Sequence, residues 1–222
     1  MKYLTIFFVI LFITSTYAVE PDSIGRDPKY VVNIIGRSQK IVDGLEICLP
    51  SDQRKVLHII ANRYFQLNDI YEKRDGQLAV VKADTALGTD MRKIRNEQIQ
   101  AEKDAALYRT RFAFIAALQL YLTNTQIDAV KDGMTFGVLM VTYNSMLDMI
   151  PSLKFEEKKQ IMAWLTEARE FAIDAESSNK KHEIFGKYKG RINNYLSARG
   201  YNLTLERENW YKRIEAKKKA NP

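Results

Sequence analysis

The chain has 222 residues, of which 34 are Lys or Arg and 27 are Asp or Glu, so its formal net charge is +7. Its hydrophobic share of 46% is enough for one ordinary core in a chain of this length. The single cysteine, Cys48, excludes an intrachain disulfide, so the core must supply the stability. Cys48 lies between Ile47 and Leu49 and is expected to be a buried small apolar side chain, with a reactive or dimer-forming thiol as the alternative.

The N-terminus has the pattern of a secretory signal peptide. Met1-Lys2-Tyr3 precede an apolar run from Leu4 to Ile13, and small residues lead to a cut near Ala18. The run is too short to span a membrane, and no later stretch is apolar enough. We therefore expect a periplasmic or secreted product with one domain over residues 19–222. Export makes nucleic acid an unexpected partner, so the basic excess suits acidic glycans, anionic lipid surfaces or no particular partner.

Helical periodicity dominates the first half of the mature chain. A first amphipathic helix is expected to open at Pro28, and a second at Pro50, with its apolar stripe reaching Tyr71. A long helix is then expected from Asp90 to Leu122. Its first half is charged and exposed, whereas its second half offers apolar residues, including Phe112, to a core.

The second half contains the clearest helix start. Thr123 and Gln126 form a capping box between apolar residues, which predicts a helix from Thr123. Residues 134–143 are rich in strand formers, but helix is favoured over strand there. Further helices are expected from about 155 to 172, from the Ser177 cap to Gly200, and from about 204 to 219, where a basic tail begins near 212. Strict alternation is nowhere sustained. The predicted class is an all-α single-domain bundle of about seven helices, with no substantial sheet.

Two pairs of glycines, each four residues apart, stand out within the predicted helices. They are Gly133 with Gly137 and Gly186 with Gly190. Because an interior glycine destabilises a helix by about 1 kcal/mol relative to alanine, each pair indicates a close approach to the backbone. A tight helix crossing is the simpler interpretation, and a ligand lying against the exposed backbone is the alternative.

Polar residues are dense around the second glycine pair. Arginine offers a planar fork to a carboxylate, and amides pair with vicinal hydroxyls, so these residues suit a hydroxylated or carboxylated ligand. An ordinary solvated helix face is the alternative. The candidate ligand-binding residues in this segment are Lys187, Lys189, Arg191, Asn193 and Asn194.

Three carboxylates of the preceding helix, Glu167, Glu170 and Asp174, share one face. Paired carboxylates divide acid and base roles in glycoside hydrolysis, whereas helical neighbours more often form salt bridges. Only His58 and His182 are available as imidazole ligands, so no bound metal is expected. The chain also lacks a nucleophile elbow, a phosphate loop and a dinucleotide fingerprint, so we expect no cofactor.

Five segments of residues 122–210 form recognisable motifs: Val130–Gly137, Val141–Tyr143, Met149–Pro151, Glu167–Glu170 and Lys187–Leu196. In these segments the chain resembles the bacterial domain-of-unknown-function family 3826, and residues 67–70 and 74–75 fit more loosely upstream. The resemblance implies an exported protein that occurs among the polysaccharide-degrading functions of Gram-negative bacteria and has been suggested to bind sugars. It supplies no established catalytic residues.

The leading hypothesis is therefore a carbohydrate-binding or carbohydrate-processing accessory protein. Its ligand would be a glycan, either neutral or acidic. Because the family segments coincide with both glycine pairs and the polar stripes, one common site is expected, to which Lys131, Asp132, Tyr143 and Arg169 are added. A glycan lyase or hydrolase is the second hypothesis, with His182, Glu170 or Tyr195 transferring the proton. A helical envelope chaperone or structural protein is the third. The sequence leaves the oligomeric state open.

Overall fold

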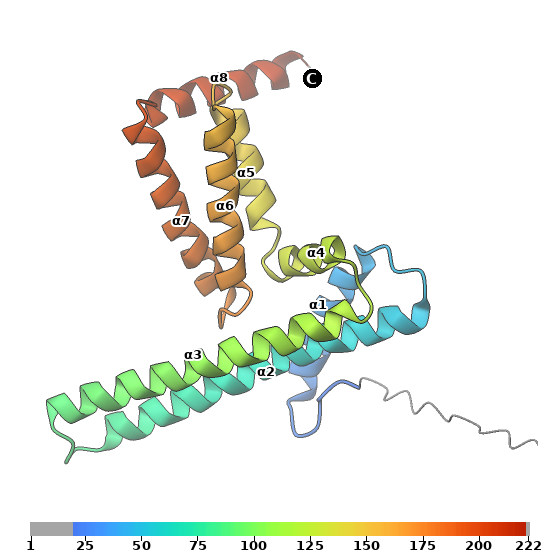
Figure 1. Ribbon diagram of the computed structural model, residues 1–222, viewed down its shortest axis with the longest axis vertical. Helices are drawn as coiled ribbons and strands as arrows, with labels where there is room; N and C mark the ends of the chain where they lie inside the picture. The colour runs from blue at the N-terminus through green and yellow to red at the C-terminus, as the bar shows by residue number, and fades with distance from the viewer. Residues whose placement is uncertain (1–19, 221–222) are drawn as a thin grey trace, which may run out of the picture.

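The computed structural model describes residues 20–220, and that part of the chain is built from helices without a strand (Figure 1). The predicted signal peptide, residues 1–18, lies outside it. The all-α prediction is confirmed, with eight helices instead of about seven. None of the described helices is long and apolar enough to cross a membrane. The helices are α1 Pro28–Asp43, α2 Pro50–Ala83, α3 Thr89–Gln119, α4 Asn124–Met134, α5 Val138–Met149, α6 Phe155–Ala172, α7 Ser178–Ala198 and α8 Leu203–Ala220.

A break after Met134 produces the additional helix. Phe136 has a φ of 61° and Gly137 a φ of 65°, so two successive residues are left-handed and end α4. Gly137 then serves as the N-cap of α5. The preference for helix over strand in residues 134–143 is confirmed, but the helix is interrupted at residues 135–137.

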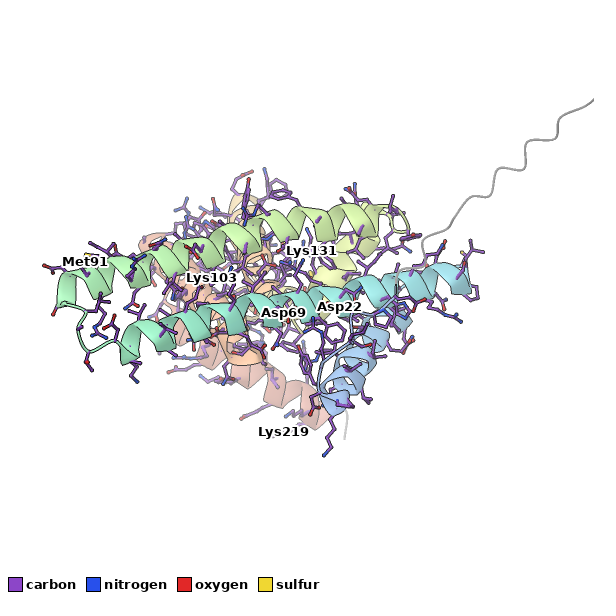
Figure 2. The ribbon with its side chains drawn as sticks, turned by 90° about the horizontal axis from the view of Figure 1, so that it is seen from below. Asp22, Asp69, Met91, Lys103, Lys131 and Lys219 are labelled. Atoms are coloured by element: carbon purple, nitrogen blue, oxygen red, sulfur yellow. The ribbon has the colours of Figure 1, made fainter. Side chains whose placement is uncertain are left out.

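Helices α2 and α3 form a long antiparallel hairpin. α2 continues through Gly76 to Ala83, beyond the predicted apolar stripe that reaches Tyr71. Arg92 closes the hairpin, because its guanidinium donates hydrogen bonds to the carbonyls of Val81 and Asp84, each at 2.8 Å. Met91 lies at the tip of the hairpin, and Lys103 lies further along α3 towards its middle (Figure 2).

The other helices stand on this hairpin. Figure 1 shows α5, α6 and α7 upright above α2 and α3, with α8 crossing their far ends. Two hydrophobic cores result: one joins α1, α2, α4 and the C-terminal half of α3, and the other joins α5, α6 and α7. α8 is held to the end of α5 because the Trp210 indole donates to Asp148 at 2.5 Å and Arg213 donates to the Asp148 carbonyl at 2.7 Å.

The loop between α6 and α7 fastens the second core to the hairpin. Buried Asp174 accepts hydrogen bonds from Arg63 of α2 and Arg111 of α3, both at 2.5 Å. Tyr71 donates to the Asp174 carbonyl at 2.7 Å. Ile173 is buried in the first core. These contacts fix how α6 and α7 stand on the hairpin.

Two burial predictions are wrong. Cys48 is exposed, because it lies in the irregular connection between α1 and α2 and not on the buried face of a helix. Phe112 is 58% exposed although it was expected in the core. α3 packs through Leu107, Phe114 and Leu118, and Phe112 instead contacts exposed Tyr108 edge to face, with ring centroids 4.9 Å apart.

Candidate functional site

An open cleft of about 830 Å³ lies between the α2–α3 hairpin and the α6–α7 pair. Its volume is in the range of protein sites for small molecules. The hairpin contributes side chains such as Tyr71 and Tyr108, and the α6–α7 side contributes Phe171 and Tyr188. The cleft therefore exists only because the α6–α7 loop holds the two parts of the molecule at this angle.

The aromatic side chains of the cleft present open ring surface. Tyr108 is 65% exposed and Phe171 is 53% exposed, from opposite walls. Burial raises the pKa of Tyr71 to about 12 and also raises the pKa of Tyr188, so both phenols stay protonated at neutral pH, and the Tyr71 hydroxyl donates to the Asp174 carbonyl. Open aromatic faces beside polar side chains suit a ligand that has both apolar and hydroxylated surfaces.

Most charges in the cleft are paired within it. Lys103 contacts Asp104 at 2.9 Å, Arg74 contacts Glu176 at 2.7 Å, and Lys180 contacts Glu183 at 2.9 Å. Asp174 is shared by two arginines. Lys187 also lines the cleft but forms no ion pair within residues 20–220. The cleft thus has many donors and acceptors and one uncommitted cation.

A ladder of aromatic and charged side chains leaves the cleft at Tyr188 and continues along α6 and α7. Each member lies beside the next: Glu167 helps to raise the pKa of Tyr188 and lies 3.4 Å from the Arg191 guanidinium. The Arg191 guanidinium carbon is 4.5 Å from the centroid of Trp164. The ladder comprises Tyr188, Glu167, Arg191, Trp164, Tyr195 and Arg199.

The sequence profile of the family described as protein of unknown function (DUF3826) matches residues 31–216. The chain belongs to this family. No curated protein matches the chain. The match extends well upstream of residues 122–210, where the sequence motifs were recognised, so the DUF3826 region includes both cores and both walls of the cleft.

Three of the predicted site residues of this DUF3826 chain lie on the cleft and its ladder. Lys187 lines the cleft, and Arg191 and Tyr195 belong to the ladder. Lys189, Asn193 and Asn194 are exposed on α7 but belong to neither. The predicted polar residues of α7 therefore lie on different faces of the helix, and only those that face α6 join the site.

Four other predicted residues form a closed ion cluster between α4 and α6. Arg169, only 6% exposed, contacts Asp128 at 2.7 Å and Asp132 at 3.0 Å. Lys131 contacts Glu170 at 3.1 Å, and Glu170 also accepts from Arg169 at 3.3 Å. Asp132 and Glu170 are thus held by cations of the chain itself. The three carboxylates Glu167, Glu170 and Asp174 are each in a salt bridge, which agrees with the simpler interpretation of their spacing.

The remaining predicted residues lie elsewhere. Tyr143 is half-buried against the second core. His182 is exposed and stacks on Phe136, with ring centroids 5.9 Å apart. The structure therefore spreads the predicted residues over both sides of α6 and both sides of α7. The expectation that they gather in one site with the two glycine pairs is wrong.

The glycine pairs differ from the expectation as well. Gly133 is tightly packed, because an added Cβ would lie 2.8 Å from Ile41 Cγ1 of α1. Gly137 is not inside a helix and is required by its positive φ. An added Cβ at Gly186 or Gly190 would meet nothing within 4 Å. The tight crossing is confirmed at Gly133 alone, and the close approach predicted at the second pair is wrong.

Sequence reasoning missed the hairpin wall of the cleft. Tyr71, Lys103, Tyr108 and Arg111 come from helices that lie far from α7 in sequence. The one local signal was Tyr108 among charged residues of α3, an aromatic side chain on a face too polar to be core.

Proposed function

We propose that this DUF3826 protein is exported and binds a glycan in the cleft, with the chain of sugars continuing along the Tyr188–Arg199 ladder. The observation that carries the proposal is the pair of exposed aromatic side chains, Tyr108 and Phe171, on the two walls of a cleft that is otherwise lined largely by hydroxyl and charged groups. Sugar rings have apolar faces and hydroxylated edges, so they match this lining better than a wholly apolar ligand does. The family resemblance and the predicted signal peptide support the same proposal.

The charges favour a glycan with acidic groups. The carboxylates of the cleft form salt bridges with cations of the chain, and Lys187 is left available for a ligand. Arg191 is the next cation along the ladder, 54% exposed at its side chain. A uronate carboxylate at Lys187 would gain a charge-assisted hydrogen bond, which a neutral sugar cannot offer.

A tryptophan signal provides the binding assay. The chain has two tryptophans, Trp164 in the ladder and Trp210 on α8. The W210F variant leaves Trp164 as the only tryptophan, so its fluorescence reports on the ladder. Titration with neutral and uronate oligosaccharides is expected to shift this emission in a saturable manner. The same samples, assayed for released reducing or unsaturated ends, test the alternative of a lyase or hydrolase.

Two exposed phenylalanines of α6 give a matched control. Phe171 lines the cleft, whereas Phe155, 71% exposed, lies at the other end of the helix. Phe171→Ala is expected to weaken glycan binding roughly tenfold, the effect of losing a stacking contact of about 1.4 kcal/mol. Phe155→Ala is expected to bind as the parent does. Equal affinities for both variants would place the glycan outside the cleft.

A second matched pair tests the acidic preference. Lys187→Gln is expected to weaken binding of a uronate oligosaccharide roughly tenfold and to leave a neutral one unchanged. Lys189→Gln removes another exposed cation two residues away, outside the cleft, and is expected to change neither. If Lys187→Gln affects both glycans equally, the cleft has no acidic preference.

A groove elsewhere favours a second candidate function, the binding of an apolar polypeptide segment as a chaperone would. A groove of about 910 Å³ lies between α1 and α4 and includes Val32, Ile41 and Phe136. Val32 is 70% exposed and Phe136 47%. Suppression of aggregation of an unfolded client without any sugar, lost in Val32→Asp, would support this function and not the first.

A further inference from the structure

A narrow crevice on the other side of the α6–α7 loop holds a buried lysine. Lys181 of α7 is only 6% exposed. Its ammonium donates one hydrogen bond, to the Met134 carbonyl at 2.8 Å, and lies 5.6 Å from the ring centroid of Tyr64. An ammonium has three donors, so this single hydrogen bond leaves two of them uncommitted.

A second cation lies beside it. Arg37 of α1 lines the same crevice, with its guanidinium carbon 5.7 Å from the Tyr64 centroid. Both cations therefore lie beside the Tyr64 ring. Neither Arg37 nor Lys181 forms an ion pair with any carboxylate in residues 20–220. Two cations close together without a counter-ion are unfavourable, the more so when one of them is buried.

The carboxylates near the crevice are engaged elsewhere. Glu176 lines the crevice but contacts Arg74 at 2.7 Å. Asp174, which also acts on Lys181 through its charge, is held by Arg63 and Arg111. Tyr64 cannot serve as an anion at neutral pH, because burial raises its pKa to about 12.

The lining of the crevice is suited to a small anion. Its volume is about 140 Å³, room for a few water molecules at about 30 Å³ each. Ser177 and Ser178 line it at the first turn of α7, where backbone N–H groups favour negative charge. Phe136, held in a left-handed conformation, closes it with its ring 6.0 Å from the Lys181 ammonium. Backbone strain of this kind is often found where a ligand is bound.

From this arrangement we infer that the crevice binds a small oxyanion between Arg37 and Lys181. The ligand class is a phosphate, a sulfate or a carboxylate, and the anion completes the charge pairing that the chain leaves open. This site is separate from the glycan cleft and does not depend on it. Its groups are Arg37, Lys181, Ser177, Ser178 and Asn68.

The test measures the thermal unfolding of the full chain as anion is added, against chloride at equal ionic strength. Inorganic phosphate and sulfate form one arm, and acetate and glucuronate form the other, which distinguishes a free inorganic anion from the acid group of a sugar. A ligand that binds only the folded state raises Tm, and the expected saturable shift is roughly 2–4 °C.

Two variants and a control locate the site. Lys181→Met and Arg37→Gln are each expected to abolish the anion-dependent shift. Lys29→Gln, an exposed cation near the start of the same helix as Arg37, is expected to retain it. Arg37 is exposed, so its substitution leaves the core intact and keeps the test valid if Lys181→Met does not fold.

The inference is overturned if no anion produces a saturable shift, or if the shift is equal in Arg37→Gln, Lys29→Gln and the parent. In that second case the anion raises Tm by screening the positive surface charge, and not by binding in the crevice. A shift with inorganic anions alone identifies a phosphate or sulfate site, and a shift with glucuronate and acetate alone identifies a carboxylate site. Loss of glycan binding in the Phe171→Ala variant leaves these results unaffected.

Discussion

Arg63 and Asp174, 111 positions apart in the sequence, form a buried ion pair in which Arg63 Nη2 lies 2.5 Å from Asp174 Oδ1. Their side chains are 1% and 4% exposed. The same arginine donates to Thr110 and Gln66, and the second oxygen of Asp174 is bound by Arg111. Every strong charge of this network therefore has a partner, and the network joins the hairpin to the α6–α7 loop.

Removing the carboxylate charge is expected to destabilise the protein strongly. Asp174→Asn leaves Arg63 buried without a counter-ion, which lowers the free energy of unfolding by about 3–5 kcal/mol. Urea denaturation followed by circular dichroism measures the loss. Glu208→Gln, at an exposed position of α8, is the control and should stay within about 0.5 kcal/mol of the parent. A loss no larger for Asp174→Asn than for the control would contradict the role of the network.

Alanine substitution of Gly133 in α4 and of Gly190 in α7 is expected to change the free energy of unfolding in opposite directions. Gly133→Ala places a Cβ 2.8 Å from Ile41 Cγ1, so α1 and α4 must separate and the protein loses about 1–3 kcal/mol. Gly190→Ala meets open space inside α7 and should gain up to about 1 kcal/mol from helix propensity. Denaturant titrations of both variants measure the difference. Two losses of the same size would show that something contacts α7 at Gly190.

Lys181 is expected to give the stability a distinct pH dependence. Burial, followed by the charge of Arg37, lowers its pKa to about 8, while Arg63 opposes and Asp174 favours the charged form. Between about pH 8 and the ordinary lysine pKa of about 10.4, the unfolded chain binds a proton that the folded chain does not. The free energy of unfolding, relative to Lys181→Met, should therefore rise with pH across this window. Chloride buffers avoid competition from oxyanions. If the free energy of unfolding depends on pH in the same way in the parent and in Lys181→Met, the lowered pKa of Lys181 is refuted.

Cys48 is expected to react as an accessible thiol. It is exposed in the connection between α1 and α2, and it is the chain's one cysteine. A maleimide should label the folded protein stoichiometrically at neutral pH without denaturant, at a rate close to that of the protein in urea. Mass spectrometry of the intact chain measures the label. Labelling that appears only after unfolding would show that Cys48 is shielded in solution.

Local chemistry was sufficient to predict most helices. The capping box at Thr123 is formed as the sequence indicated, because the Thr123 amide donates to the Gln126 side chain at 2.9 Å and the Gln126 amide donates back to Thr123 at 3.3 Å. Pro28 and Pro50 open α1 and α2 where proline is tolerated. The break after Met134 was not visible, because Phe136 is left-handed only through the packing of α4 and α5, and nothing in a phenylalanine favours that conformation.

The candidate site depended much more on tertiary structure. Lys187 and Arg191 could be selected as cations on a helix, but the sequence could not show that Lys187 lines a cleft with Phe171 of α6 on its own side and Tyr108 of α3 on the other. In sequence, nothing shows that Lys181, Asp174 and Arg169 are buried, and only the fold buries them. The sequence by itself determined the helices, because helix periodicity and capping act over a few residues. Which side chains meet was decided by packing between segments many tens of residues apart, and those contacts leave no local pattern to read.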